Sequence, residues 1–105
     1  KLNLRKEYGI RLTLINRSIE PVPLNMSAAT AVKDGDYEPG DPKFLEIKPK
    51  KLKLKGESME KLDMYLQIPD EEQYRNKKYV FLIASQVPAD VPVEVFSKLF
   101  ITTGE

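Results

Sequence analysis

Apolar side chains recur at every second position through most of this chain, and no other feature of the sequence constrains its fold more. The segment 10–14 reads IRLTL, and the segment 22–26 reads VPLNM. Successive side chains of a β-strand point to opposite faces, so a segment of this kind buries one face and exposes the other. The alternation predicts a protein made of short, half-buried strands.

Further strands are expected at 44–47, 52–54, 62–68, 79–84 and 93–101, with a short leading strand around Leu2 and Leu4. The segment 79–84, YVFLIA, is apolar on both faces and should be the most buried strand. Ser97 and Lys98 are expected to form a bulge in the last strand. For 59–66 a helix beginning after Ser58 is an open alternative, because Met59, Leu62 and Leu66 also fit helical spacing.

Turn residues separate these strands at intervals that are typical of a β-sandwich. Asn16-Arg17-Ser18 ends the first alternating run, and residues 33–42, KDGDYEPGDP, form a loop rich in Gly, Pro and Asp. The 105 residues contain only five glycines, fewer than the bends of a small closed barrel usually need. We therefore expect an all-β fold, an antiparallel β-sandwich of seven to eight strands. Residues 1–105 should form one such domain, and a first residue Lys1 rather than Met suggests that it is part of a larger protein.

Histidine and cysteine are both absent, which removes the usual general base, the thiolate nucleophile, disulfides and the commonest metal ligands. The remaining acid pairs, such as Glu71-Glu72, lie in polar loops rather than in the apolar surroundings that acid–base catalysis needs. We predict that the protein is not an enzyme and has no cofactor. No stretch approaches the roughly 20 apolar residues that span a bilayer, so we expect no membrane insertion.

The run FLEIKPKKLKLKGES at 44–58, the strand leading to Ile68-Pro69, and the YVFLIA strand resemble immunoglobulin-like domains of the PapD-like and major-sperm-protein type. The opening IRLTLINRS also resembles an early strand of those domains. The resemblance implies that the all-β fold is an immunoglobulin-like antiparallel β-sandwich of seven to eight strands. This fold serves in pilus chaperones, cytoskeletal proteins, peptide-binding modules and spacer domains. Pilus chaperones of this type hold a client's C-terminal carboxylate with an arginine and a lysine. Arg5 and Arg11 are candidates by position, but no motif fixes the match and the site is not carried over.

The predicted function is that of a non-catalytic structural or protein-interaction module, with an extracytoplasmic location (cell surface or periplasm) favoured. Its partner would be another protein or a neighbouring domain of the same chain. Strand addition to an exposed sheet edge uses backbone hydrogen bonds and alternate side-chain pockets. The last strand and the 33–42 loop are the candidate contacts, and the predicted partner-binding residues are Tyr37, Val93, Val95, Leu99 and Ile101.

Five lysines crowd the segment 48–55, and Lys51, Lys53 and Lys55 alternate there; we call these three the basic stripe. Lysines on an edge strand oppose aggregation, and this interpretation is preferred over binding of a polyanion. No nucleic-acid partner is predicted, because no aromatic residue is interleaved with the lysines.

The alternative function is a carbohydrate- or calcium-binding accessory module. Calcium would use the carboxylates of the 33–42 loop, namely Asp34, Asp36, Glu38 and Asp41, although their spacing fails the EF-hand pattern. Carbohydrate would use exposed tyrosines such as Tyr37 and Tyr65.

Overall fold

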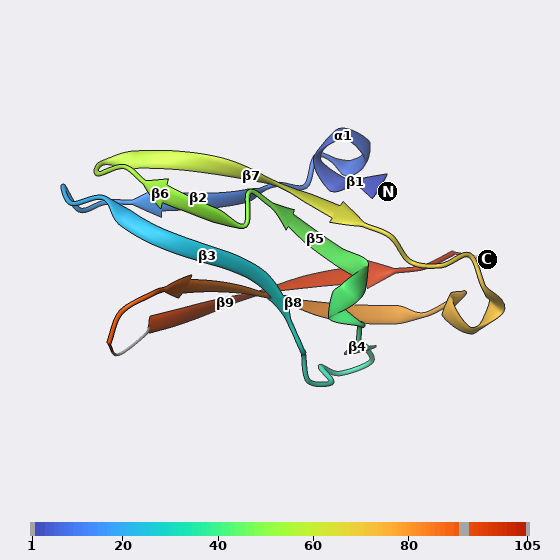
Figure 1. Cartoon of the computed structure of the whole chain (residues 1–105). Helices are drawn as coiled ribbons and strands as arrows, with labels where there is room; N and C mark the ends of the chain where they lie inside the picture. Colours follow the sequence, from blue (N-terminus) through green and yellow to red (C-terminus); the bar gives the residue numbers. More distant parts are fainter. Residues whose placement is uncertain (1, 91–92, 105) are drawn as a thin grey trace.

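Two β-sheets face each other in the computed structural model, which describes residues 2–90 and 93–104 (Figure 1). Within these residues seven strands have at least four residues, and β1 and β4 have two each. In chain order the elements are β1 (Leu2–Asn3), α1 (Leu4–Tyr8), β2 (Leu12–Asn16), β3 (Val22–Ala29), β4 (Glu38–Pro39), the 3-10 turn η1 (Pro42–Phe44), β5 (Leu45–Lys48), β6 (Lys51–Leu54), β7 (Ser58–Leu66), the 3-10 turn η2 (Glu72–Tyr74), β8 (Lys78–Val87) and β9 (Val93–Thr102). The all-β sandwich prediction is confirmed.

The first sheet is built around β7, which pairs with β1 and β2 along one edge and with β5 along the other. Leu62, Met64 and Leu66 point inward and are buried, whereas the residues between them lie on the outer face. The segment 58–66 is therefore a strand, and the helical alternative is wrong.

The second sheet is built around β8. Strand β9 pairs with one edge of β8 in a single antiparallel register from Val93 to Thr102, while β3 and β4 lie along the other edge and β6 pairs with β3. The two-residue pairing of β4 with β8 is parallel, an exception to the antiparallel expectation. Tyr79, Phe81 and Ile83 are buried on the inner face of β8. Val80 and Ala84 are buried as well, so the prediction that this is the most buried strand is confirmed.

The two long sides of the sandwich are closed differently. On one side the chain passes directly from β5 in the first sheet to β6 in the second, so residues 49–50 join the layers. On the opposite side lie the edge formed by β1, α1 and β2, and the edge formed by β9. Among the described residues no strand pairing joins these two edges.

Two local expectations are wrong. Leu4 is not part of a leading strand but begins α1, a short helix that Asn3 caps by accepting hydrogen bonds from the backbone N–H groups of Arg5 and Lys6. Gly9 ends the helix in the left-handed region at φ 69°, which glycine adopts without strain. The bulge expected at Ser97-Lys98 does not exist, because the pairing of β9 with β8 is continuous there.

No helix in the described part of the chain is long and apolar enough to cross a membrane.

Candidate functional site

Strand β9 is an edge strand whose second side carries no pairing with any described residue. The N–H of Thr103 donates to the carbonyl of Lys77, and hydrogen-bonded pairs alternate along an antiparallel ladder. Odd-numbered residues of β9 therefore direct their backbone groups toward β8. Even-numbered residues, from Glu94 to Thr102, direct their N–H and C=O groups away from the sheet, which leaves donors and acceptors free for a further strand.

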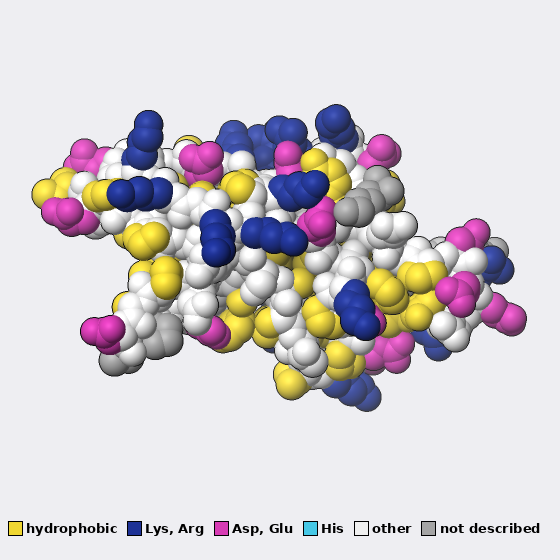
Figure 2. Space-filling model, viewed as in Figure 1, with side chains coloured by type: hydrophobic (Ala, Val, Ile, Leu, Met, Phe, Trp, Pro, Cys, Tyr) yellow, Lys and Arg dark blue, Asp and Glu magenta, His cyan; other side chains and the backbone are white. Residues whose placement is uncertain are grey.

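The inner face of β9 changes from buried to exposed along its length. Leu99 is 8% exposed, whereas Val95 on the same face is 61% exposed and Val93 is 57% exposed. The reason is visible in Figure 2, where the surface is indented between the end of the β8–β9 hairpin and the ends of β2, β6 and β7. Toward this end β8 and β9 diverge from the opposite sheet, as Figure 1 shows, so the inward-pointing valines of the first half of β9 stay exposed.

The outer face of β9 also exposes large apolar side chains. Phe96 is 50% exposed and Phe100 is 47% exposed. An exposed ten-residue edge strand that is apolar on both faces is unusual, since edge strands are normally shortened or charged to prevent strand addition. Contiguous exposed apolar surface of this kind marks interaction sites.

The structure places the predicted contact Tyr37 beside the second half of β9. The Tyr37 ring packs edge-on against Phe100 with 4.8 Å between ring centroids, and Lys78 lies over the same ring. Asp34 forms an ion pair with Lys98 at 2.8 Å. These contacts bring the 33–42 loop onto the outer face of β9 and leave Tyr37 half-buried.

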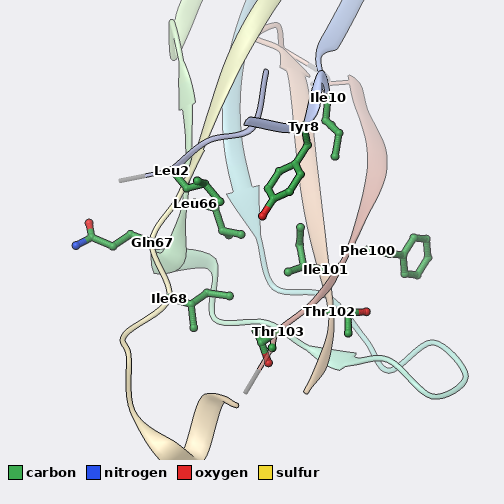
Figure 3. A pocket seen from close by; sticks show the side chains of 11 residues that line it. Leu2, Tyr8, Ile10, Leu66, Gln67, Ile68, Phe100, Ile101, Thr102 and Thr103 are labelled. Atoms are coloured by element: carbon green, nitrogen blue, oxygen red, sulfur yellow. The ribbon is translucent and has the colours of Figure 1, made fainter. Parts of the chain in front are cut away.

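A groove of about 600 Å³ runs between the N-terminal segment and the second half of β9 (Figure 3). Tyr8 extends its ring between Leu66 and Ile101, while the ring of Phe100 points away from the groove. The groove places the predicted contact Ile101 next to residues from β1, α1 and the end of β7. This groove was not expected from the sequence because α1 was not expected. The available signals were Asn3 and Gly9, which flank the five residues of the helix.

The basic stripe lies at the opposite edge of the same sheet. Lys51, Lys53 and Lys55 are exposed, whereas Leu54 is buried and Leu52 half-buried. Arg5, one of the two positional candidates for a carboxylate anchor, forms an ion pair with Asp63 at 2.8 Å.

Two of the four loop carboxylates, those of Asp34 and Asp41, form contacts within the protein. Asp34 pairs with Lys98, and Asp41 accepts a hydrogen bond from the backbone N–H of Lys43 at the start of η1. In residues 2–90 and 93–104 no group of three or more acidic side chains could hold a metal ion. Burial raises the pKa of the Tyr79 hydroxyl, with smaller contributions in the same direction from Glu38 and Tyr74.

Only the comparison with solved structures gives matches. No protein-family model matches the sequence, and no curated protein matches it. Among solved structures, the CupB2 chaperone of Pseudomonas aeruginosa is 17% identical with a TM-score of 0.66, over 91% of this chain and 48% of that chain. The E. coli chaperone DraB is 18% identical with a TM-score of 0.63, over 90% of this chain and 46% of DraB.

A third similar structure is a complex of the CsuC chaperone with the tip adhesion subunit CsuE, from the archaic chaperone-usher Csu pili of Acinetobacter baumannii. The identity is 13% and the TM-score is 0.67, over 90% of this chain and 44% of that chain. The chain therefore spans slightly less than half the length of these proteins. At such identities the likeness establishes the fold, and the PapD-like immunoglobulin-like sandwich expected from the sequence is confirmed.

Proposed function

We propose that this chain is a non-catalytic protein-interaction module of an extracytoplasmic, chaperone-like protein, and that it binds its partner by strand addition to β9. The observation that carries the proposal is that the outward backbone groups of β9 pair with no described residue, while its valines and phenylalanines are exposed. A partner segment in extended conformation would satisfy the backbone groups of the even-numbered residues and cover Val93 and Val95.

The similar structures support this proposal. Each is a chaperone, one was solved with an adhesion subunit bound, and a further similar structure, SfaE, is described as a periplasmic chaperone. A binding module needs no catalytic side chains, and the chain has neither histidine nor cysteine. The partner is another protein or a neighbouring domain of the same chain.

Carbohydrate or calcium binding receives no such support. Asp34 is neutralised by Lys98, and Tyr37 packs against Phe100 instead of presenting an open face. Tyr65 lies under the ammonium group of Lys48, 5.4 Å from its ring centroid. The tyrosines that would have to form a stacking platform are therefore already in contact with other side chains.

The test is an NMR titration with a synthetic ten-residue peptide in which valine and lysine alternate. We expect the peptide to shift the backbone amide signals of Glu94, Phe96 and Lys98, whose N–H groups point outward. The matched control is the same peptide with proline at alternate positions, which cannot donate to a ladder. Signal changes that leave β9 untouched, or equal binding of the proline peptide, would refute strand addition.

A further inference from the structure

The positive charge of the chain is concentrated in one short segment. Residues 48–55 contain five lysines and no acidic residue, whereas the whole chain has 17 basic and 16 acidic residues. The rest of the chain therefore has 12 basic against 16 acidic residues, a net charge of −4, and the chain reaches +1 only through this segment. Figure 2 shows Lys and Arg side chains gathered over β5 and β6.

The backbone of β6 is unpaired on one side. Strand β6 pairs only with β3 among the described residues, from Lys51 opposite Asn25 to Leu54 opposite Val22. The N–H of Met26 donates to the carbonyl of Lys50, so even-numbered residues of β6 bond to β3. The backbone groups of Lys51 and Lys53 consequently point to the free edge, the side opposite β3.

The ammonium groups of the basic stripe have no acidic partner in the described structure. Lys48, which precedes the stripe in the sequence, forms an ion pair with Glu46, with 3.4 Å between Lys48 Nζ and Glu46 Oε1. By contrast, no described carboxylate pairs with Lys51, Lys53 or Lys55. The residues opposite Lys51 and Lys53 on β3 are Asn25 and Pro23, which are uncharged. The stripe is therefore a row of exposed positive charges. Lys51 and Lys53 lie in β6, where alternate residues are about 6.7 Å apart along the strand, and Lys55 directly follows the last residue of β6.

We propose that β6 is a second protein-binding edge, which takes an extended acidic segment carrying carboxylates at alternate positions. Such a segment has the same side-chain period as the stripe, so each carboxylate would lie opposite one lysine. Its backbone would bond to the outward groups of Lys51 and Lys53. A polypeptide fits better than nucleic acid or glycan, because no aromatic side chain lies among these lysines for a base or sugar to stack on.

The experiment is a fluorescence anisotropy titration of the full chain at low and physiological salt. The probe is a labelled nine-residue peptide in which glutamate and threonine alternate. The matched peptide has the same composition with its glutamates contiguous. We expect the alternating peptide to bind at least about fivefold more tightly than the contiguous one, because only its carboxylates match the lysine spacing along an added strand. We also expect it to shift the amide signals of Lys51 and Lys53 in NMR spectra.

Charge-reversal variants separate this proposal from general attraction and from edge protection. Lys51→Glu/Lys53→Glu/Lys55→Glu should weaken binding about 10-fold or more, since it replaces three attractive cross-strand pairs by repulsive ones. The control Lys6→Glu/Lys33→Glu/Lys77→Glu removes the same charge at exposed positions elsewhere and should change binding less than about twofold at physiological salt, where distant charges are screened. Thermal unfolding checks that both variants are folded.

Three results would overturn the proposal. The alternating and contiguous peptides could bind with equal affinity, or the stripe variant and the control variant could lose affinity equally. Either result would mean that the peptide binds only by non-specific charge attraction. Alternatively, the wild-type chain could fail to bind the alternating peptide while Lys51→Thr/Lys53→Thr/Lys55→Thr self-associates, in which case the lysines serve only to block edge-to-edge contact.

Discussion

The two edges of the second sheet both carry backbone groups that no described strand pairs with, but they differ in length, in side chains and in attachment. Strand β9 has ten residues, exposes valine and phenylalanine, and directs five residues' backbone groups to solvent. Strand β6 has four residues, alternates leucine with lysine, and is attached at its end to β2. Lysines and short length are the usual means of keeping an edge from pairing with apolar strands. The exposed apolar side chains are therefore specific to the β9 edge, since the other edge of the same sheet does not share them.

The same contrast exists within β9. Leu99 packs into the core beside Phe81, its cross-strand partner, while Val95 on the same face is exposed. The second half of the strand holds the sandwich together, and the first half is available for contact. The predictions below test this division, from the largest expected effect on stability to the smallest.

Leu99→Ala should lower the free energy of unfolding by about 2–5 kcal/mol, because it leaves a cavity in the core. Val95→Ala should change it by less than about 0.5 kcal/mol, since an exposed side chain loses little on truncation. Chemical denaturation measures both, and similar losses for the two variants would show that β9 is uniformly packed. Val95→Ala should nevertheless weaken binding of the valine–lysine peptide.

Asn16→Ala should cost about 2–3 kcal/mol and loosen the attachment of β6. The Asn16 side chain is 7% exposed, donates to the carbonyls of Glu20, Leu54 and Lys55, and accepts from Ser18. Its loss removes a hydrogen bond from the buried carbonyl of Leu54 and from three part-buried backbone groups. Asn25→Ala on β3 is the control, expected to cost less than about 1 kcal/mol, and thermal melts distinguish the two. Equal melting temperatures would mean that Asn16 does not secure this end of the sandwich.

Proline substitutions at neighbouring positions of β9 should act in opposite ways. Val95→Pro removes an N–H that points toward β8 and should cost about 1–3 kcal/mol of stability. Phe96→Pro removes an N–H that points to solvent, a position that edge strands tolerate. It should therefore cost less stability and abolish peptide binding, whereas Phe96→Ala, which keeps the N–H, retains measurable binding. A Phe96→Pro variant with wild-type affinity would refute backbone pairing at this edge.

Asp34→Asn should have the smallest effect, below about 1 kcal/mol, because both groups of its ion pair with Lys98 are partly exposed. The expected loss shrinks further as salt is added. Urea denaturation at two salt concentrations measures it, with Asp36→Asn as the control. A loss above about 2 kcal/mol that persists at high salt would show that the 33–42 loop is a main support of β9.

The alternation of apolar residues was sufficient to predict the sandwich, the most buried strand and the last strand. Period-two patterns report directly which side chains face the core, so Leu62 and Leu66 could be placed correctly despite their helical spacing. They do not report which sheet a strand joins. Nothing in the run 44–55 indicated that β5 and β6 belong to different sheets, because both segments carry the same alternation.

The helix α1 and the continuous register of β9 were not predicted for related reasons. A five-residue helix is too short to show helical periodicity and depends on tertiary packing, here the complete burial of Leu4. The expected bulge at Ser97-Lys98 assumed that a change in burial requires a change in backbone register. The change in burial arises instead because β9 and the opposite sheet diverge toward the beginning of β9.

The most direct test of the account is residue-resolved amide hydrogen exchange along β9 in the free protein. The account predicts slow exchange for Val95, Ser97 and Leu99, whose N–H groups bond to β8, and fast exchange for Phe96, Lys98 and Phe100. Equal protection of the two sets would contradict it, since it would mean that the outer side of β9 is already paired.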